Sequence, residues 1–131
     1  MNSNFLFYSS IAAGVYSVVS ALAYYTYSGK QLISSSKAKK MLKEHKIKAV
    51  IDVRTKVEYD IGHYKKAIHF PIAKMNPKSI HVVMNRNSIH KDDAILLYCN
   101  TGQRARKAAE KLNESGYKNV YYIAGMYKSI E

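Results

Sequence analysis

The only cysteine of the chain, Cys99, lies where a thiol could act as a nucleophile. It follows an apolar segment, residues 94–98, and precedes a short polar loop that contains Gly102. A helix-forming run starts at Arg104. This order predicts a strand, a tight loop and a helix N-terminus, so that backbone N–H groups and the positive end of the helix face the sulfur. Such surroundings stabilise a thiolate, the reactive form of cysteine.

A single cysteine also fits a simple packing role, because free cysteine is small and is often buried. The loop and the helix that follow Cys99 favour the catalytic interpretation, since packing requires neither of them. With one cysteine the chain cannot form an internal disulfide, so its fold does not depend on oxidation.

The segments around this loop alternate between helices and short apolar strands. Strands are predicted over 49–53, 67–70, 94–98 and 119–123, helices over 37–45, 77–85 and 104–115, and a helical turn over 56–61. This alternation indicates an α/β fold with a mainly parallel sheet and helices on both faces. Sites in such folds form at the carboxyl ends of the strands, which is where Cys99 is expected.

The first part of the chain has a different composition. Residues 1–29 contain no charged side chain, and residues 5–27 are apolar, small or aromatic. About 20 such residues can cross a bilayer as a helix. We therefore predict one transmembrane helix over 1–29, a polar tether over 30–36 and a globular domain over 37–131. A cleavable signal peptide and a buried core helix are the alternatives, but residues 1–4 lack the basic character of a signal peptide.

All 21 Lys and Arg residues and all 9 Asp and Glu residues follow this apolar segment. Lysines directly after a membrane helix favour the cytoplasmic side, so a single-pass membrane protein with a cytoplasmic domain is predicted. The same lysines would attract anionic membrane lipids. No nucleic-acid motif accompanies the basic charge, and no nucleic-acid partner is expected. Small residues at positions 9, 13, 17 and 21 would allow weak self-association through the helix.

Three groups of residues, in this order along the chain, resemble the rhodanese-like domain family. The first is Ile-Asp-Val-Arg at 51–54 with Glu58, His63 and the segment 67–71. The second is the loop 99–105, and the third is the segment 116–120 followed by Gly125. The resemblance extends from about residue 34 to the end of the chain. It implies a rhodanese-like α/β fold and a sulfurtransferase activity.

The resemblance also implies roles for individual residues. Cys99 would take a sulfane sulfur from a donor such as thiosulfate or a protein persulfide, and would pass it to a thiol acceptor or to cyanide. Arg104 would add positive charge near the sulfur. The expected sulfur-binding loop comprises Asn100, Thr101, Gly102, Gln103, Arg104 and Ala105. The expected structural supports are Asp52, Arg54, Glu58 and His63. The five histidines show no metal-ligand spacing, and neither a metal nor another cofactor is expected.

Two other functions stay open at this point: a non-catalytic interaction module, and a phosphatase or arsenate reductase. A degenerate module would usually have lost the cysteine. Related phosphatases place five residues between cysteine and arginine, whereas four separate Cys99 from Arg104. The shorter loop suits one sulfur atom better than a tetrahedral oxyanion. Met126 and Ile130 stand where the family often has glycine and tryptophan, which predicts a looser C-terminal lid.

Overall fold

The computed structural model of the protein describes residues 31–131 and the single residue Val15. Residues 31–131 form a compact unit around a four-stranded sheet in the order β2-β1-β3-β4. The strands are β1 (Ala49–Asp52), β2 (Ile68–His69), β3 (Ala94–Tyr98) and β4 (Asn119–Tyr122). All three pairings are parallel, so the carboxyl ends of the strands share one edge of the sheet.

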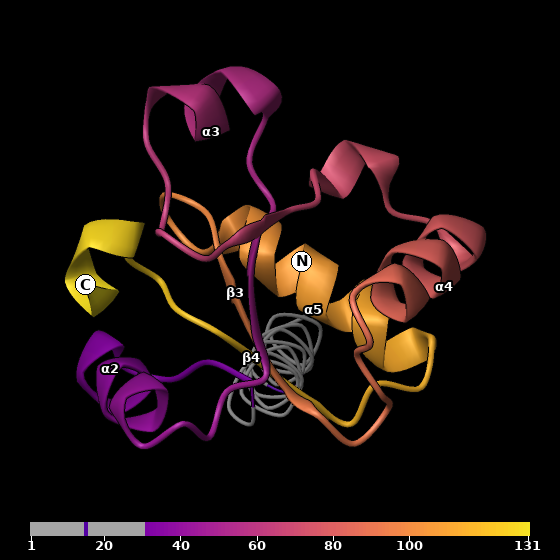
Figure 1. Ribbon diagram of the computed structural model, residues 1–131, viewed down its shortest axis with the longest axis horizontal. Helices are drawn as coiled ribbons and strands as arrows, with labels where there is room; N and C mark the ends of the chain where they lie inside the picture. The colour runs from indigo at the N-terminus through magenta and orange to yellow at the C-terminus, as the bar shows by residue number, and fades with distance from the viewer. Residues whose placement is uncertain (1–14, 16–30) are drawn as a thin grey trace, which may run out of the picture. The chain divides into compact units, whose positions relative to one another are not determined.

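Helices cover both faces of this sheet (Figure 1). The helices are α2 (Ser35–Lys43), α3 (Lys56–Ile61), α4 (Pro77–Arg86) and α5 (Gln103–Glu114), with 3-10 turns η1 (Ile72–Lys74) and η2 (Tyr127–Ile130). In Figure 1, α2 and the C-terminal turn lie on one side of the strands, and α4 and α5 lie on the other. The predicted parallel sheet with helices on both faces is confirmed.

Each face of the sheet has its own hydrophobic core. Successive residues of a strand point to opposite faces, so β3 supplies Ile95 and Leu97 to the core under α4 and α5. Its alternate residues, Leu96 and Tyr98, belong to the core under α2 and η2. All four are fully buried. Strands buried on both faces explain why the sequence shows continuous apolar runs rather than an alternating pattern.

The globular domain begins earlier than the sequence indicated. Gln31 and Ile33 lie along β4, where the N–H of Tyr122 donates to the Gln31 carbonyl (2.8 Å) and the N–H of Ile33 donates to the Tyr122 carbonyl (3.0 Å). The expected tether over 30–36 is therefore corrected, since from Gln31 onward it is part of the domain. Helix α2 starts at Ser35 instead of residue 37, because the side chain of Ser34 caps it by accepting from the N–H of Lys37 (3.0 Å).

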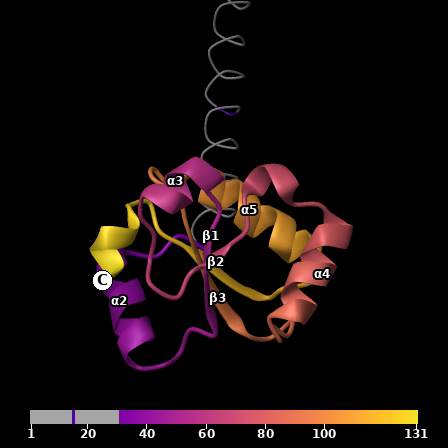
Figure 2. The ribbon, with the colours of Figure 1, turned by 45° about the horizontal axis from the view of Figure 1, so that its top comes forward.

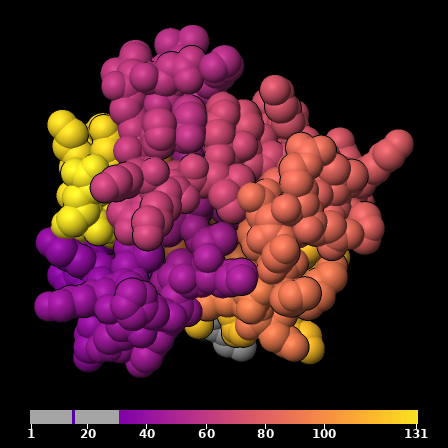
Figure 3. Space-filling model, viewed as in Figure 1, coloured from indigo at the N-terminus to yellow at the C-terminus, as the bar shows by residue number. Residues whose placement is uncertain are grey.

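The predicted transmembrane helix over 1–29 lies outside the described residues, apart from Val15. In the part of the chain that the structure describes, every helix is too short or too polar to span a bilayer. Figure 2 shows the described domain from a second direction, with α3 above the carboxyl edge of the sheet. In the space-filling view of Figure 3, the C-terminal turn η2 (yellow) lies beside α2 (indigo), where the Ser35 hydroxyl donates to the Ser129 hydroxyl at 2.8 Å.

A buried polar cluster lies at that carboxyl edge. The hydroxyl of Tyr98 donates to Oδ2 of Asp52 (2.7 Å) and accepts from the N–H of Tyr64 (2.9 Å). Burial alone would raise the pKa of Asp52, but the hydrogen bonds from Arg54 outweigh it and hold that pKa below its ordinary value. Burial raises the pKa of Tyr98, so its hydroxyl stays protonated and keeps donating. The cluster joins β1, β3 and the segment before β2.

We predict that Tyr98→Phe destabilises the domain without changing its fold. The substitution keeps the buried ring but leaves the Tyr64 N–H and one lone pair of Asp52 without their partner, which costs about 1–3 kcal/mol of unfolding free energy. Urea denaturation of the purified chain measures the difference. Tyr121→Phe, at a half-buried tyrosine of β4, is the matched control. An equal effect of the two substitutions would contradict the role assigned to the Tyr98 hydroxyl.

Candidate active site around Cys99

Cys99 directly follows β3 and lies under the first turn of α5. Its side chain is almost enclosed, with 1% of the residue exposed. The backbone N–H groups of Gly102 and Ala105 both donate to its Sγ, at 3.1 Å and 3.4 Å. The sulfur thus faces the amide groups at the N-terminus of a twelve-residue helix, where partial positive charge accumulates. Negative charge on this sulfur, or on an atom bound to it, is stabilised there.

Gly102 makes this approach of helix and sulfur possible. It is the N-cap residue of α5 and has a left-handed backbone, with φ of 92°. A Cβ at this position would lie 2.9 Å from the Cα of Ala124, a backbone atom that cannot move aside cheaply. Both observations require glycine. The tight turn of the loop therefore depends on Gly102.

Glu58 of α3 ties that helix to the cysteine loop. Its carboxylate accepts two hydrogen bonds from the guanidinium of Arg104, at 2.6 Å and 2.9 Å, and one from the side-chain amide of Asn100, at 2.8 Å. Glu58 also closes the capping box of α3 with Thr55. The bonds from Arg104 are the main reason why the pKa of Glu58 falls from 4.5 to about 2. Glu58 is therefore ionised throughout the physiological range.

Arg104 makes a contact that the sequence did not indicate. The sequence suggested a guanidinium that lends positive charge to the sulfur, and the structure also places it in a two-pronged ion pair with Glu58. Glu58 is the main cause of the raised pKa of Arg104, and the charge of Cys99 adds to it. The guanidinium is thus within electrostatic reach of the sulfur while it is paired with Glu58. Its main role is to hold the loop to α3.

Arg54 makes a second link to the loop from the buried side. Its guanidinium donates to Oδ2 of Asp52 (2.7 Å) and to the carbonyl of Gly62 (2.6 Å). Its Nη1 also reaches Oδ1 of Asn100 at 3.5 Å. Asp52 and Arg54 are both buried, so this ion pair is shielded from water. The pair connects β1, the end of α3 and the cysteine loop.

The remaining predicted residues divide into framework and surface positions. Nδ1 of His63 lies 2.8 Å from the carbonyl oxygen of Tyr59, and the two rings are stacked with their centroids 3.7 Å apart. His63 therefore belongs to the framework that follows α3. Thr101 and Gln103 are exposed on the loop. Tyr98 is a further framework residue, which the sequence indicated only by a hydroxyl group in an otherwise aliphatic strand directly before the cysteine.

Comparison with known proteins agrees with this geometry. A family model described as a rhodanese-like domain matches residues 34–131. The chain belongs to the rhodanese-like domain family. The part that matches contains the cysteine loop and all of its supporting residues.

Several characterised proteins are similar to parts of the chain. A tRNA uridine(34) hydroxylase of Buchnera aphidicola is 35% identical over 82 residues, which cover 63% of this chain and 26% of that protein. The corresponding hydroxylase of an Enterobacter strain is 33% identical over 78 residues, covering 57% of this chain and 21% of that protein. The chain therefore spans about a quarter of the length of these relatives.

Solved structures show the same fold. A human single-domain sulfurtransferase superposes with a TM-score of 0.61 at 20% identity, covering 75% of this chain and 92% of that one. The solution structure of a rhodanese-like domain from an Anabaena protein gives a TM-score of 0.61 at 22% identity, covering 77% of this chain and 72% of that one. At this level of identity the likeness concerns the fold alone.

We predict that the ion pair of Glu58 and Arg104 makes the stability of the domain depend on pH in the acidic range. Glu58 holds its proton less tightly in the folded state (pKa about 2) than in the unfolded chain (about 4.5). Its contribution is complete above pH 4.5 and is lost as the pH falls toward 2. Glu58→Gln should cost about 1–2 kcal/mol at neutral pH, since the side chain is partly solvated, and should flatten the acid dependence.

Unfolding by urea at several pH values tests this prediction. Glu110→Gln on α5 is the control, because Glu110 forms no ion pair within residues 31–131. If the slope of stability against pH were the same in wild type and in Glu58→Gln, the ion pair would contribute nothing to the fold.

Proposed function

We propose that the domain is a sulfurtransferase that carries a sulfane sulfur as a persulfide on Cys99. The observation that supports this most is the pair of hydrogen bonds from the Gly102 and Ala105 N–H groups to Sγ. They favour the thiolate that must attack, and they would also face the negative charge of a persulfide. Membership of the rhodanese-like family supports the same chemistry.

The reaction takes place in two steps. With thiosulfate as donor, the Cys99 thiolate attacks the outer sulfur, the donor S–S bond breaks, and sulfite leaves with the bonding electron pair. The new S–S bond, about 2.05 Å long, places the transferred sulfur beyond Sγ. A thiolate acceptor or cyanide then attacks this outer sulfur and releases the Cys99 thiolate. No proton transfer to or from a protein side chain is required if donor and acceptor are anions.

The enclosure of the site supports transfer of a single atom. Cys99 is only 1% exposed, so a donor must reach it with a narrow, extended group such as a sulfane sulfur. Thr101 and Gln103 are exposed on the loop and would be the first side chains that a donor meets. A phosphate or arsenate needs room for four oxygen atoms around one centre. The short loop and the buried sulfur favour a sulfurtransferase over an oxyanion-processing enzyme.

The hydroxylase activity of the curated relatives is not part of this proposal. Those proteins match this chain over about a quarter of their own length. The similarity therefore concerns the part of each relative that aligns with this chain. The donors that we propose are thiosulfate or a protein persulfide, and the acceptor is a thiol.

We predict that Cys99→Ser abolishes sulfur transfer, because a serine hydroxyl is far less ionised than a thiol and cannot form a persulfide. Thiosulfate:cyanide turnover of the purified protein should fall to the uncatalysed background. Cooperative unfolding of the variant checks that the fold is retained. Lys39→Gln, on α2 and outside the cysteine loop, is the control and should keep its activity. A Cys99→Ser protein that turned over at the wild-type rate would contradict the proposal.

We also propose that residues 1–29 anchor the enzyme to a membrane, with the domain on the cytoplasmic side and its basic surface toward anionic lipids. The support is the sequence alone: an uncharged stretch followed by a domain with net charge +12. Self-association through this segment would be weak.

The full chain should stay in the membrane fraction after alkaline carbonate extraction. This treatment releases proteins that are held only by surface charge, whereas an apolar helix in the bilayer resists it. A variant with four lysines introduced within residues 10–20 is the control, and it should be recovered in the supernatant. Intact wild-type protein in the supernatant would contradict the anchor and leave the sulfurtransferase proposal unaffected.

A further inference from the structure

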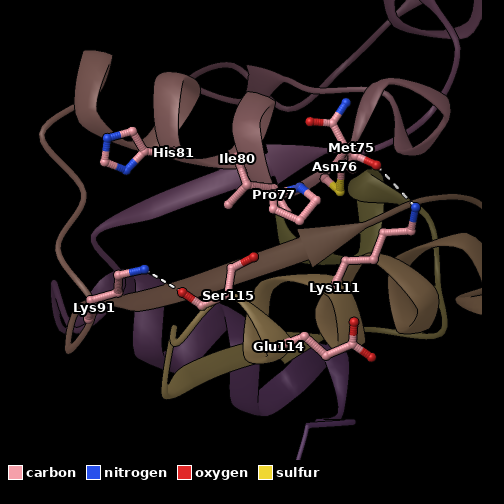
Figure 4. A pocket seen from close by; sticks show the side chains of 9 residues that line it. All are labelled: Met75, Asn76, Pro77, Ile80, His81, Lys91, Lys111, Glu114 and Ser115. Carbon is pink, nitrogen blue, oxygen red and sulfur yellow. Dashed lines mark hydrogen bonds between the residues drawn. The ribbon is translucent and has the colours of Figure 1, made fainter.

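A cavity of about 440 Å³ lies between the start of α4 and the end of α5 (Figure 4). Its volume lies in the range of sites for small molecules, roughly 300–1,000 Å³. Its lining residues come from α4, from the last turn of α5 and from the loops beside them, and include none of the cysteine loop. The twelve residues of α5 extend about 18 Å from the Cys99 end, so the cavity is separate from the sulfur site.

Two lysines are held in place at opposite sides of this cavity. Nζ of Lys111 donates to the carbonyl of Met75 at 3.1 Å. Nζ of Lys91 donates to the carbonyl of Ser115, and it lies 4.3 Å from the ring centroid of Tyr117. Figure 4 shows the two ammonium groups on either side of Ser115. Because these contacts already order both side chains, a ligand would lose less conformational entropy on binding than at free surface lysines.

Each ammonium group keeps donors for a ligand. An ammonium group has three N–H donors, and the backbone carbonyl takes one of them in each lysine. The rest of the lining is mixed: Met75, Pro77 and Ile80 are apolar, whereas Asn76, His81 and Ser115 are polar. Glu114 is the one acidic residue among the lining residues. The cavity thus combines two separated positive charges with a partly apolar lining.

We propose that this cavity binds a small organic dianion with an apolar middle, of the class of aliphatic or aromatic dicarboxylates. One carboxylate pairs with Lys91 and the other with Lys111, while the carbon chain lies on Pro77 and Ile80. Separated cations favour two separated anionic groups over a single one. A compact anion such as inorganic phosphate can pair with only one of two separated ammonium groups, so it forms fewer of these contacts than a dicarboxylate. The proposal is independent of the function assigned to Cys99.

The test uses the full chain in detergent micelles and straight-chain dicarboxylates of increasing length, from succinate to pimelate. Monocarboxylates with the same number of carbons are the comparison. Titration calorimetry should show saturable binding with one preferred chain length and tighter binding of the dianion than of its monoanion. An affinity that is the same for all chain lengths would indicate only unspecific attraction to a basic protein and would overturn the proposal. The absence of saturable binding would overturn it as well.

Variants assign the binding to the cavity. Lys91→Gln and Lys111→Gln should each weaken binding of the preferred dicarboxylate roughly tenfold. Each should also remove the difference in affinity between the dianion and its monoanion. Lys39→Gln, on the helix α2 that covers the other face of the sheet, is the matched control and should bind like wild type. If Lys39→Gln weakened binding as much as the cavity variants, the proposal would be wrong.

Glu114→Gln gives a test in the opposite direction, which a loss of folding cannot imitate. Removing this carboxylate relieves repulsion with the ligand and should tighten binding a few-fold. Cys99→Ser should leave binding unchanged, because the two sites are separate. Weaker binding in Glu114→Gln would place the ligand outside the cavity.

Discussion

The contact between the Cys99 sulfur and the first turn of α5 is the feature on which the rest of the site depends. Two backbone amides donate to Sγ, and this is possible because Gly102 adopts a left-handed conformation that brings the helix N-terminus over the end of β3. The parallel sheet supplies the other half of the arrangement. Its strands end at one edge, so the cysteine, the Asp52 carboxylate and α3 all meet there.

Two ion pairs hold this arrangement from opposite sides. On the buried side, Arg54 joins Asp52 to the end of α3 and to Asn100. On the partly exposed side, Arg104 and Asn100 both bond to Glu58. Each arginine is matched by a carboxylate, and two backbone amides of α5 donate directly to the sulfur. These amides are fixed dipoles, which need no rearrangement to stabilise negative charge at the sulfur.

Much of this fold could be predicted from the sequence, because the strands are short, apolar and buried on both faces. The strand 94–98 agrees with β3 residue for residue, and Pro77 and Gly102 mark the starts of α4 and α5. The start of the domain could not be predicted, since residues 31–33 are held by main-chain bonds to β4 that leave no pattern in side chains. The partner of Arg104 was equally hidden, because Glu58 is 46 positions away and meets it only through the sheet topology.

The most direct test of the central claim is mass spectrometry of the full chain after incubation with thiosulfate and removal of excess donor. We expect the protein to gain the mass of one sulfur atom, fragmentation to place this sulfur on Cys99, and a thiol acceptor to remove it again. Wild-type protein that gains no sulfur under these conditions, or that gains it at the same level when Cys99 is serine, would contradict the persulfide mechanism.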